Sequence, residues 1–470
     1  MEEVETDWVH DEFEALDLGD ERLNHRAREV MKQLAAKPTT SLPLACGGRA
    51  EMEAAYRLFD NENAEWDRIA APHWGATEKR ASEHPVVLCL ADTTELDFNG
   101  QKAAGLGPLN YEARRGMYLH ASYMVTSERL PLGITNLCMW ARQFRDKDGV
   151  RHGQKESLRW VEGYENLVEI AGRLPATRLV YVADRESDIV GLMWRACELG
   201  NCVDWLIRAK HNRNCLAQAD ADAMRDGTDE ANNPATGQSE PEVERLWQLT
   251  TNGEPLGEVT FMMPGRGKVK AREVRQNLWA KRVNISAGKG RNVAVTCIIA
   301  REVAAPKGVD PVEWRLLTNR EAPTREHVIE LLDWYRARWE IEMFFNVLKN
   351  GCKVEAMQLK TIDRIERALT IYAIVAWRVA FLMRLGRICP DMDAAAFFHP
   401  DEIKGAYLLS KTPLPKEPPR LREFIRIIAK LGGFLGRKSD GEPGVKAMWI
   451  GLQRVMDAAS TIQALRELQE

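Results

Sequence analysis

The sequence predicts an α/β protein in which a core containing a β-sheet lies between a helical N-terminal region and a helical C-terminal region. Two short, wholly apolar runs, Val86 to Ala91 and Leu179 to Ala183, have the character of buried strands, and an aspartate follows each at once. Short strand-like segments between residues 257 and 300 predict a separate antiparallel β insertion. Helical apolar periodicity marks both ends of the chain.

The elements follow in order along the chain. Residues 14–80 are expected to be helical, and after them come strands, one amphipathic helix and the β insertion of about residues 211–320. Helix returns after Pro323, with Thr324 as a plausible N-cap and Gly351 as the stop. The bounds we predict are helices 23–35, 51–59 and 155–174 and strands 86–91, 117–126, 131–140, 179–183, 257–263, 278–286 and 292–300.

The C-terminal third is predicted to be helical, with a break at the Pro-rich stretch 412–419. Its last helix places one apolar stripe along its length: Val445, Met448, Trp449, Leu452 and Met456. We therefore predict three domains: a helical N-terminal domain (1–70), a core (71–375) that includes the insertion, and a helical C-terminal domain (376–470).

Composition excludes some classes of protein. The nine cysteines form no CxxC pair, so neither a disulfide framework nor a structural zinc site is indicated. The N-terminus is acidic and lacks an apolar segment, so no secretory signal is expected. The longest apolar run, Ala368 to Trp377, spans about half a membrane and is followed by Arg378. A buried helix and a cytoplasmic location, with no membrane partner, are the expectation.

Charge is uneven along the chain, although the formal net charge is only −4. The first 22 residues contain ten acids and one Arg, and residues 216–241 form a polar, acidic loop of unknown role. Residues 266–291 contain nine Lys or Arg and one Glu, and this run is as consistent with a solvated loop as with a surface that faces DNA. A nucleic-acid partner would need the basic residues to lie on one side.

Asp92 and Asp184 are candidate metal ligands. In an open α/β sheet, ligands gather at the carboxyl ends of the strands. Two acids delivered there could hold divalent ions about 3.5–4 Å apart, as in two-metal phosphoryl-transfer sites. An ordinary turn cap is the alternative for either aspartate alone.

The stretch from Tyr335 to Lys349 adds a third acid. Tyr335, Arg338, Glu342 and Lys349 would fall within an arc of about 60° on one continuous helix at about 100° per residue. A scissile phosphate and its metal would suit such a stripe, with Glu342 on the metal and the cations on phosphate oxygens. A solvated face with an Arg338–Glu342 ion pair is the alternative.

The pattern Tyr-x₂-Arg-x₃-Glu-x₆-Lys resembles the signature of the bacterial insertion-sequence transposases of the DDE class. This family includes the cut-and-paste enzyme of a kanamycin-resistance transposon. Further strings similar to that family occur in the same order: Leu18-Gly19-Asp20 with Arg22, Ala54 to Arg57, Asp92-Thr93-Thr94, Gly116 to His120, Lys155-Glu156-Ser157, Asp184 to Asp188 and Leu431-Gly432-Gly433-Phe434. Together they span almost the whole chain.

The resemblance implies an RNase H-like core of the retroviral integrase superfamily. It implies that Asp92, Asp184 and Glu342 hold two Mg²⁺ ions, with Mn²⁺ able to substitute. The resemblance assigns DNA contacts to six further residues: Tyr335, Arg338, Lys349, Trp314, Arg208 and Lys210. Trp314 would stack on a flipped base, although a core aromatic in a strand is the alternative. His120 is expected to be a structural hydrogen-bonder rather than a ligand.

The implied function is cut-and-paste DNA transposition: metal-dependent hydrolysis at the transposon ends, hairpin formation and strand transfer into target DNA. The partners would be the terminal inverted repeats, target DNA and a second protomer paired through the last helix. Two alternatives remain open: an RNase H-like nuclease or resolvase without strand transfer, and a DNA-binding regulator descended from a transposase. The intact set of three acids argues against the regulator.

Overall fold

The computed structural model describes residues 8–216, 244–263, 265, 271–288, 290–437 and 440–469. The acidic loop 216–241 lies outside this range except for its first residue, and so does part of the basic run 266–291. The chain divides into two compact units. Unit 1 contains residues 1–84, 92–154 and 339–470, and unit 2 contains residues 85–91 and 155–338. The chain passes between them inside strand β1 (Val86–Asp97).

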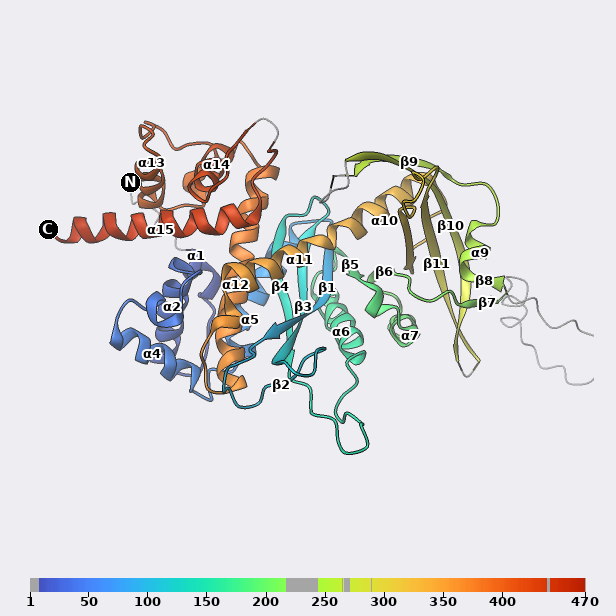
Figure 1. Cartoon of the computed structure of the whole chain (residues 1–470), viewed down its shortest axis with the longest axis horizontal. Helices are drawn as coiled ribbons and strands as arrows, with labels where there is room; N and C mark the ends of the chain where they lie inside the picture. The colour runs from blue at the N-terminus through green and yellow to red at the C-terminus, as the bar shows by residue number, and fades with distance from the viewer. Residues whose placement is uncertain are drawn as a thin grey trace, which may run out of the picture. The chain divides into compact units, whose positions relative to one another are not determined.

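Unit 1 is mainly helical (Figure 1). Its N-terminal helices are α1 (Trp8–Phe13), α2 (Glu21–Ala36), α3 (Leu42–Ala45), α4 (Arg49–Phe59) and α5 (Trp66–Ser82). Its later helices are α11 (Trp339–Asn346), a π-helical segment (Val347–Gly351), α12 (Ile362–Ile388), α13 (Pro400–Ser410), α14 (Leu421–Leu431) and α15 (Val445–Glu467). Short 3₁₀ turns lie at Val354–Ala356 and Ala394–Ala396.

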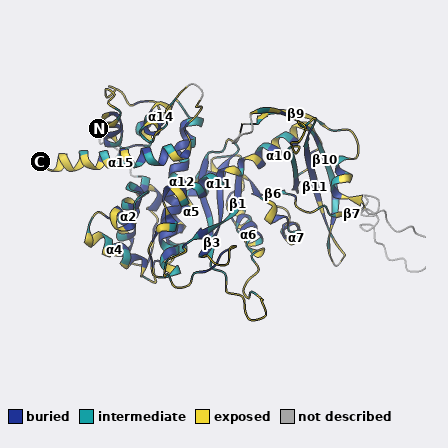
Figure 2. Ribbon diagram, viewed as in Figure 1, coloured by how far each residue is buried: buried dark blue, intermediate teal, exposed yellow. Residues whose placement is uncertain are grey.

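Helix α12 forms the core of unit 1, where it packs on α5 and on strand β4 (Pro131–Trp140). The Trp377 indole donates a hydrogen bond to the carbonyl of Pro131 at 3.2 Å. Among the described residues, α12 alone is long and apolar enough to cross a membrane, but 83% of its most apolar window is buried inside the protein. The burial agrees with the buried helix predicted around 368–377 (Figure 2).

The strands of unit 1 form an antiparallel set. β3 (Arg115–Thr126) pairs with β4 and with the short β2 (Gly107–Pro108), and it neighbours β1. Gly116 permits the close approach of β3 to β1, because a Cβ atom there would lie 2.0 Å from the carbonyl oxygen of Leu96. The glycine of the Gly116–His120 string therefore has a packing reason.

The C-terminal helices α13, α14 and α15 pack against one another. A Cβ atom on Gly432 would lie 1.9 Å from the Ala447 carbonyl, and one on Gly451 would lie 1.9 Å from the Ile428 carbonyl. The Leu431–Phe434 string is thus explained by the close crossing of α14 and α15. Four residues of the predicted stripe on α15, Val445, Met448, Trp449 and Leu452, are buried within the chain, and Met456 is half-buried, whereas the C-terminal turns of α15 are exposed (Figure 2).

Unit 2 is an α/β structure built on a mixed sheet. Its helices are α6 (Leu158–Arg173), a 3₁₀ turn (Arg185–Ser187), α7 (Val190–Glu198), α9 (Leu246–Thr251) and α10 (Arg325–Ala337). Its strands are β5 (Arg178–Ala183), β6 (Asp204–Arg208), β7 (Asn214–Leu216), β8 (Glu244–Arg245), β9 (Gly257–Met263), β10 (Arg272–Gly288), β11 (Arg291–Glu302) and β12 (Glu313–Thr318). The order β1-β5-β6-β12-β11-β10 runs through the sheet.

The sheet of unit 2 has a parallel part and an antiparallel part. β1 pairs in parallel with β5, from Val86 with Arg178 to Ala91 with Ala183, and β5 pairs in parallel with β6. β12, β11, β10 and β9 are antiparallel, and β12 joins β6. The antiparallel strands predicted between residues 257 and 300 are therefore present, and Thr324 caps α10 by accepting the His327 amide at 3.4 Å.

Candidate active site

Asp92 lies inside β1 rather than at its end. The prediction that the strand stops at Asp92 was wrong, because residues 93–97 continue as a strand beside β3. What does stop at this point is the parallel pairing with β5, whose last pair is Ala91 with Ala183. Asp92 is half-buried, and its Oδ1 accepts a hydrogen bond from the Thr93 amide at 2.8 Å.

His120 supports this part of β1 from the neighbouring strand. Its side chain on β3 is buried, with 1% exposure, and its Nδ1 lies 2.9 Å from the Thr93 hydroxyl oxygen. The contact ties the residue after Asp92 to the core of unit 1. This geometry agrees with the structural role expected for His120.

The stretch from Tyr335 to Lys349 is not one continuous α-helix. α10 ends at Ala337, and the Arg338 amide bonds to the Tyr335 carbonyl only three residues back. α11 begins at Trp339, and the chain becomes π-helical at Val347. A count of 100° per residue therefore does not carry across Arg338 or into the π-helical segment, and the shared face of the four residues stays a prediction. Tyr335 and Arg338 belong to unit 2, and Glu342 and Lys349 to unit 1.

Two acids on α11 differ in their surroundings. Glu340 is 4% exposed and accepts from Nε of Arg384 at 2.7 Å, so its carboxylate is bound up in a buried ion pair. Glu342 is half-buried. Glu340 therefore holds α11 against α12. Glu342 stays the predicted metal ligand on α11.

Lys349 has partners within unit 1. Its Nζ donates to the carbonyl oxygen of Glu95 at 2.7 Å and lies 3.3 Å from the Glu355 carboxylate. Glu355 also accepts from the Asp97 amide at 2.9 Å. These bonds hold the π-helical segment against β1, and the predicted contact of Lys349 with DNA would require it to exchange a partner.

Asp184 follows β5 directly, as the sequence predicts. It caps the 3₁₀ turn Arg185–Ser187, because its Oδ1 accepts the Glu186 amide at 2.8 Å. The Ser187 hydroxyl donates to the Asp184 carbonyl at 2.6 Å. The aspartate is half-buried, so the cap fixes the backbone of an acid that water can still reach.

Tyr335 brings several predicted residues of unit 2 together. Its side chain is 5% exposed and is hydrogen-bonded to Arg338. Burial raises the pKa of the phenol, the positive charges of Arg338 and Arg208 oppose that rise, and the negative charge of Asp184 adds to it. Tyr335 therefore lies within electrostatic reach of Asp184, Arg208 and Arg338, three residues from different elements.

Trp314, on β12, packs against Tyr335, on α10. The two rings meet edge to face, with centroids 5.5 Å apart and an interplanar angle of 83°. The indole is half-buried and lines a mainly apolar cavity of about 160 Å³ together with Phe261 and Leu332. Trp314 thus both contacts a buried aromatic ring and lines a cavity.

Arg208 and Lys210 line a second cavity of unit 2, of about 300 Å³. Sequence reasoning missed its other members, which include Arg185, Arg315 and Trp247. The Arg315 guanidinium lies 3.7 Å from the centroid of the Trp247 ring. Arg185 follows Asp184 in the sequence, and Arg315 follows Trp314. This adjacency to predicted site residues is the one sequence feature that could have indicated that the two arginines belong to the site.

Asp188 is another residue that the sequence analysis did not assign to the site. Its Oδ2 accepts the amides of Lys210 and His211 at 2.6 and 2.9 Å. Its Oδ1 lies 2.6 Å from the Arg213 guanidinium, and the Asp188 side chain is 0% exposed. This buried carboxylate fixes the loop that presents Lys210.

Three family models match successive parts of the chain. They are the Transposase DNA-binding domain over residues 5–64, the Transposase DDE domain over 162–378 and the Transposase Tn5 dimerisation domain over 374–468. Its domains are those of a DDE transposase. A DDE transposase is an enzyme that acts on DNA, and the three domains support DNA binding and dimer formation.

Among solved structures, the chain of this transposase is similar to the piggyBac transposase in a cryo-EM structure of its synaptic complex with hairpin DNA. The match has 7% sequence identity and a TM-score of 0.31. It covers 86% of this chain and 59% of that chain. The transposase described here thus spans about three fifths of the length of that relative.

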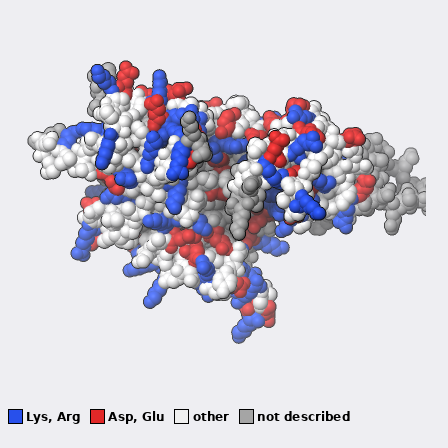
Figure 3. Space-filling model, turned by 45° about the horizontal axis from the view of Figure 1, so that its top comes forward, with Lys and Arg blue, Asp and Glu red and all other residues white. Residues whose placement is uncertain are grey.

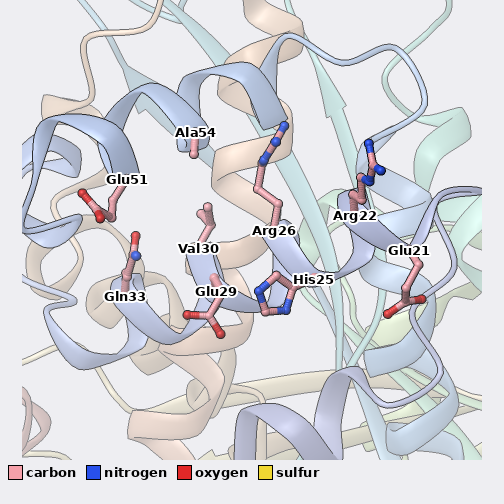
Figure 4. Close-up of a pocket in the computed structure, with 9 residues that line it drawn as sticks. All are labelled: Glu21, Arg22, His25, Arg26, Glu29, Val30, Gln33, Glu51 and Ala54. Carbon is pink, nitrogen blue, oxygen red and sulfur yellow. The ribbon is translucent and has the colours of Figure 1, made fainter.

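The DNA-binding domain of the transposase has a charged groove between α2 and α4, of about 680 Å³ (Figure 4). Arg22, His25 and Arg26 line it from α2, and Glu51 lines it from α4. Asp20 caps α2 by accepting the Arg22 amide at 2.8 Å, which fixes the start of this basic helix. The Leu18–Asp20 string is therefore explained by helix capping.

The DDE domain implies dependence on a divalent metal, typically Mg²⁺. Within the described parts of the transposase, no three His, Cys, Asp or Glu side chains are grouped so as to hold a metal ion. Asp92 and Glu342 belong to unit 1 and Asp184 to unit 2, so neither unit contains the predicted triad alone. All three are half-buried carboxylates, which are hard oxygen donors of the kind that Mg²⁺ prefers.

Proposed function

We propose that this transposase is a cut-and-paste enzyme in which Asp92, Asp184 and Glu342 act together on an RNase H-like core. The parallel strands β1, β5 and β6, with α7 between the last two, support such a core. The enzyme would act in the cytoplasm or nucleoid, where its DNA is found. Its substrates would be the inverted repeats at the transposon ends, followed by target DNA.

The register of β1 against β5 is the observation on which the proposal depends. Ala91 pairs with Ala183, and the covalent chain adds an aspartate after each. Two acids that follow paired residues of parallel strands start on the same edge of the sheet. Glu342 is a half-buried carboxylate on α11, and the resemblance to the family signature assigns it as the third acid.

The cationic residues would position the phosphodiester. Tyr335 is hydrogen-bonded to Arg338 and lies within electrostatic reach of Asp184, and the phenol and the guanidinium would donate to oxygens of the phosphate. Arg208 and Lys210 would bind the next phosphates along the strand from their basic cavity. Positioning and charge neutralisation are the main demands of phosphoryl transfer on a protein.

The proposed reaction begins with hydrolysis at the transposon end. The oxygen of water bonds to phosphorus, the bond from phosphorus to the 3′ oxygen breaks, and that oxygen takes up a proton. The free 3′-hydroxyl oxygen then bonds to a phosphorus of the opposite strand and displaces the 3′ oxygen of the flanking DNA, which takes up a proton; this closes a hairpin. Water opens the hairpin by bonding to the same phosphorus and frees the 3′-hydroxyl again. In the joining step that hydroxyl oxygen bonds to a phosphorus of target DNA and displaces a target 3′ oxygen, which takes up the proton. Mg²⁺, as two ions or with Mn²⁺ in their place, would neutralise charge on the phosphate and acidify the attacking hydroxyl when bound.

Trp314 would hold a base flipped out near the hairpin. Its indole lines a mainly apolar cavity and packs edge to face with the Tyr335 ring. The dimerisation domain would pair two protomers, each at one transposon end. Because the apolar stripe of α15 is used within the chain, exposed residues such as Leu465 and Leu468 are the proposed contacts.

Substitution of the three acids tests the proposal. The full chain is incubated with Mg²⁺ and DNA that carries the inverted repeats beside its own gene. Asp92→Asn, Asp184→Asn and Glu342→Gln should each lower cleavage by roughly a thousandfold or more, while end binding changes by no more than about threefold. Glu326→Gln, an exposed acid on α10, is the control. Cleavage by Glu342→Gln at more than a tenth of the normal rate would exclude its metal role.

A second assay separates transposition from simple nuclease activity. A pre-cleaved end with a 3′-hydroxyl is supplied with Mg²⁺ and a target plasmid. A transposase yields joined products, and these are lost in the same three variants. Cutting without any joining would instead identify an RNase H-like nuclease or resolvase.

A further inference from the structure

A group of arginines and aromatic residues in unit 1 lies outside the segments that the DNA-binding and DDE domain models match. It comes from the loop before β3 and from the loop that follows β4. We call it the arginine platform, and its members are Tyr111, Glu112, Arg114, Arg115, Arg142, Phe144, Arg145 and Arg151. The second loop projects at the bottom of Figure 1, and the same region of Figure 3 shows clustered basic side chains with a few acids.

One carboxylate holds the platform together. Oε1 of Glu112 accepts from Arg145 at 2.8 Å and from Arg151 at 2.9 Å. The hydrogen bond from Arg145 and the charges of Arg145, Arg151 and Arg142 lower the pKa of Glu112. Several guanidinium groups that converge on one oxygen anion form the arrangement by which proteins bind a phosphate oxygen. Glu112 occupies the position of that anion.

The platform also exposes two aromatic rings. Tyr111 is 71% exposed and Phe144 is 56% exposed. The Arg115 guanidinium lies 4.5 Å from the centroid of the Phe144 ring. Arginines interleaved with exposed aromatic rings are typical of surfaces that bind nucleic-acid backbones and stack on bases or sugars.

A chain of contacts connects the platform to Lys349. Arg142 donates to the Asn110 side chain at 2.7 Å and lies 4.1 Å from the centroid of the Tyr118 ring. The Tyr118 hydroxyl donates to the Glu95 carboxylate at 3.1 Å, and the Glu95 carbonyl accepts from Lys349. These contacts tie the platform to the part of unit 1 in which Lys349 contacts β1.

We propose that the arginine platform binds target DNA. This inference rests on the proposed function, since only an enzyme that joins ends to a target needs a second DNA surface. The platform lies beside the strand that contains Asp92 and is separate from the matched DNA-binding segment, residues 5–64. It neutralises phosphates and offers flat aromatic faces, which suits DNA of any sequence. Phosphates displace Glu112 from Arg145 and Arg151 when the target binds.

Variants with opposite expected effects test the platform. Phe144→Ala and Arg145→Ala in the full chain should each lower joining of a pre-cleaved end to a target plasmid by roughly tenfold. Glu112→Gln should raise joining several-fold at low salt, because it removes the internal counter-ion. Lys307→Ala, an exposed cation in unit 2, is the matched control and should leave joining unchanged. Cleavage of transposon ends, measured in the same preparations, should change less than twofold.

Binding to a duplex that lacks the terminal repeat provides an independent measurement. Arg145→Ala should lower the slope of log affinity against log salt by about one, as expected for one lost phosphate contact. An unchanged slope, or a loss of joining in Glu112→Gln equal to that in Arg145→Ala, would overturn the platform. If the wild type never joins DNA while Arg145→Ala still lowers the slope, the platform stands as a DNA surface and the transposition proposal falls. If cleavage falls with joining in Phe144→Ala, the platform binds the transposon end and not the target.

Discussion

The candidate DNA-binding residues of the two units differ in the partners that they have before DNA binds. In unit 2, Tyr335 is buried within reach of Asp184, Arg208 and Arg338, so these groups are arranged before DNA arrives. In unit 1, Lys349 already has a carbonyl and a carboxylate as partners. Unit 2 resembles a preformed phosphate site, whereas unit 1 has to exchange internal partners for DNA. Preformed groups lose less free energy on binding than groups that must first break a contact.

The buried Asp188 should be the most sensitive residue of the preformed half. Asp188→Ala removes the acceptor for two loop amides and leaves the Arg213 guanidinium, 13% exposed, without its ion-pair partner. A broken buried pair costs about 3–5 kcal/mol, so the free energy of unfolding should fall by that amount. Urea denaturation followed by circular dichroism measures it.

The control for this prediction is Asp333→Ala on α10. Asp333 is 47% exposed and lies 3.8 Å from Arg336, so its loss should cost less than about 1 kcal/mol. If Asp188→Ala lowered the free energy of unfolding no more than the control does, the loop that presents Lys210 would not depend on Asp188. Unit 2 would then be no more preorganised for DNA binding than unit 1.

The exchange of partners in unit 1 predicts opposite effects for two neighbouring variants. Lys349→Ala should weaken binding of a cut transposon end by roughly tenfold, the value of one charge-assisted hydrogen bond. Glu355→Gln should strengthen it by about twofold, because Lys349 loses a competing charge at 3.3 Å. Fluorescence anisotropy with labelled end DNA measures both affinities. Equal weakening by both variants would mean that Glu355 orients Lys349 instead of competing for it.

The sequence predicted the local elements better than their junctions. Apolar runs and turn residues located the strands around Asp92 and Asp184, because side-chain burial and backbone propensity act over a few residues. The break at Arg338 and the π-helical segment at Val347 could not be predicted in this way. Residues next to these junctions make contacts distant in sequence, such as Glu340 with Arg384 and Lys349 with the Glu95 carbonyl.

The same limit applies to residues that support the site. Asp188 fixes the Lys210 loop across more than twenty residues, and Arg315 meets Trp247 only because β12 and α9 lie close together in the fold. No local pattern marks such pairs. The short sequence strings that resemble the transposase family contain structural as well as candidate catalytic residues. Gly116 and Gly432 allow close packing of the backbone, whereas the acids are candidate metal ligands.

Trp314 gives the sharpest test of the preformed half. Trp314→Ala should slow hairpin formation by roughly tenfold, the value of one base stacked on an aromatic ring, and slow first-strand nicking by less than about twofold. Both steps are followed on end-labelled DNA by denaturing electrophoresis. Trp279→Ala removes another half-exposed strand tryptophan, whose indole bonds to the Gly253 carbonyl, and should change neither step. Because Trp314 also supports the Tyr335 ring, equal slowing of both steps would show that its role is to hold Tyr335 in place and not to stack on a base.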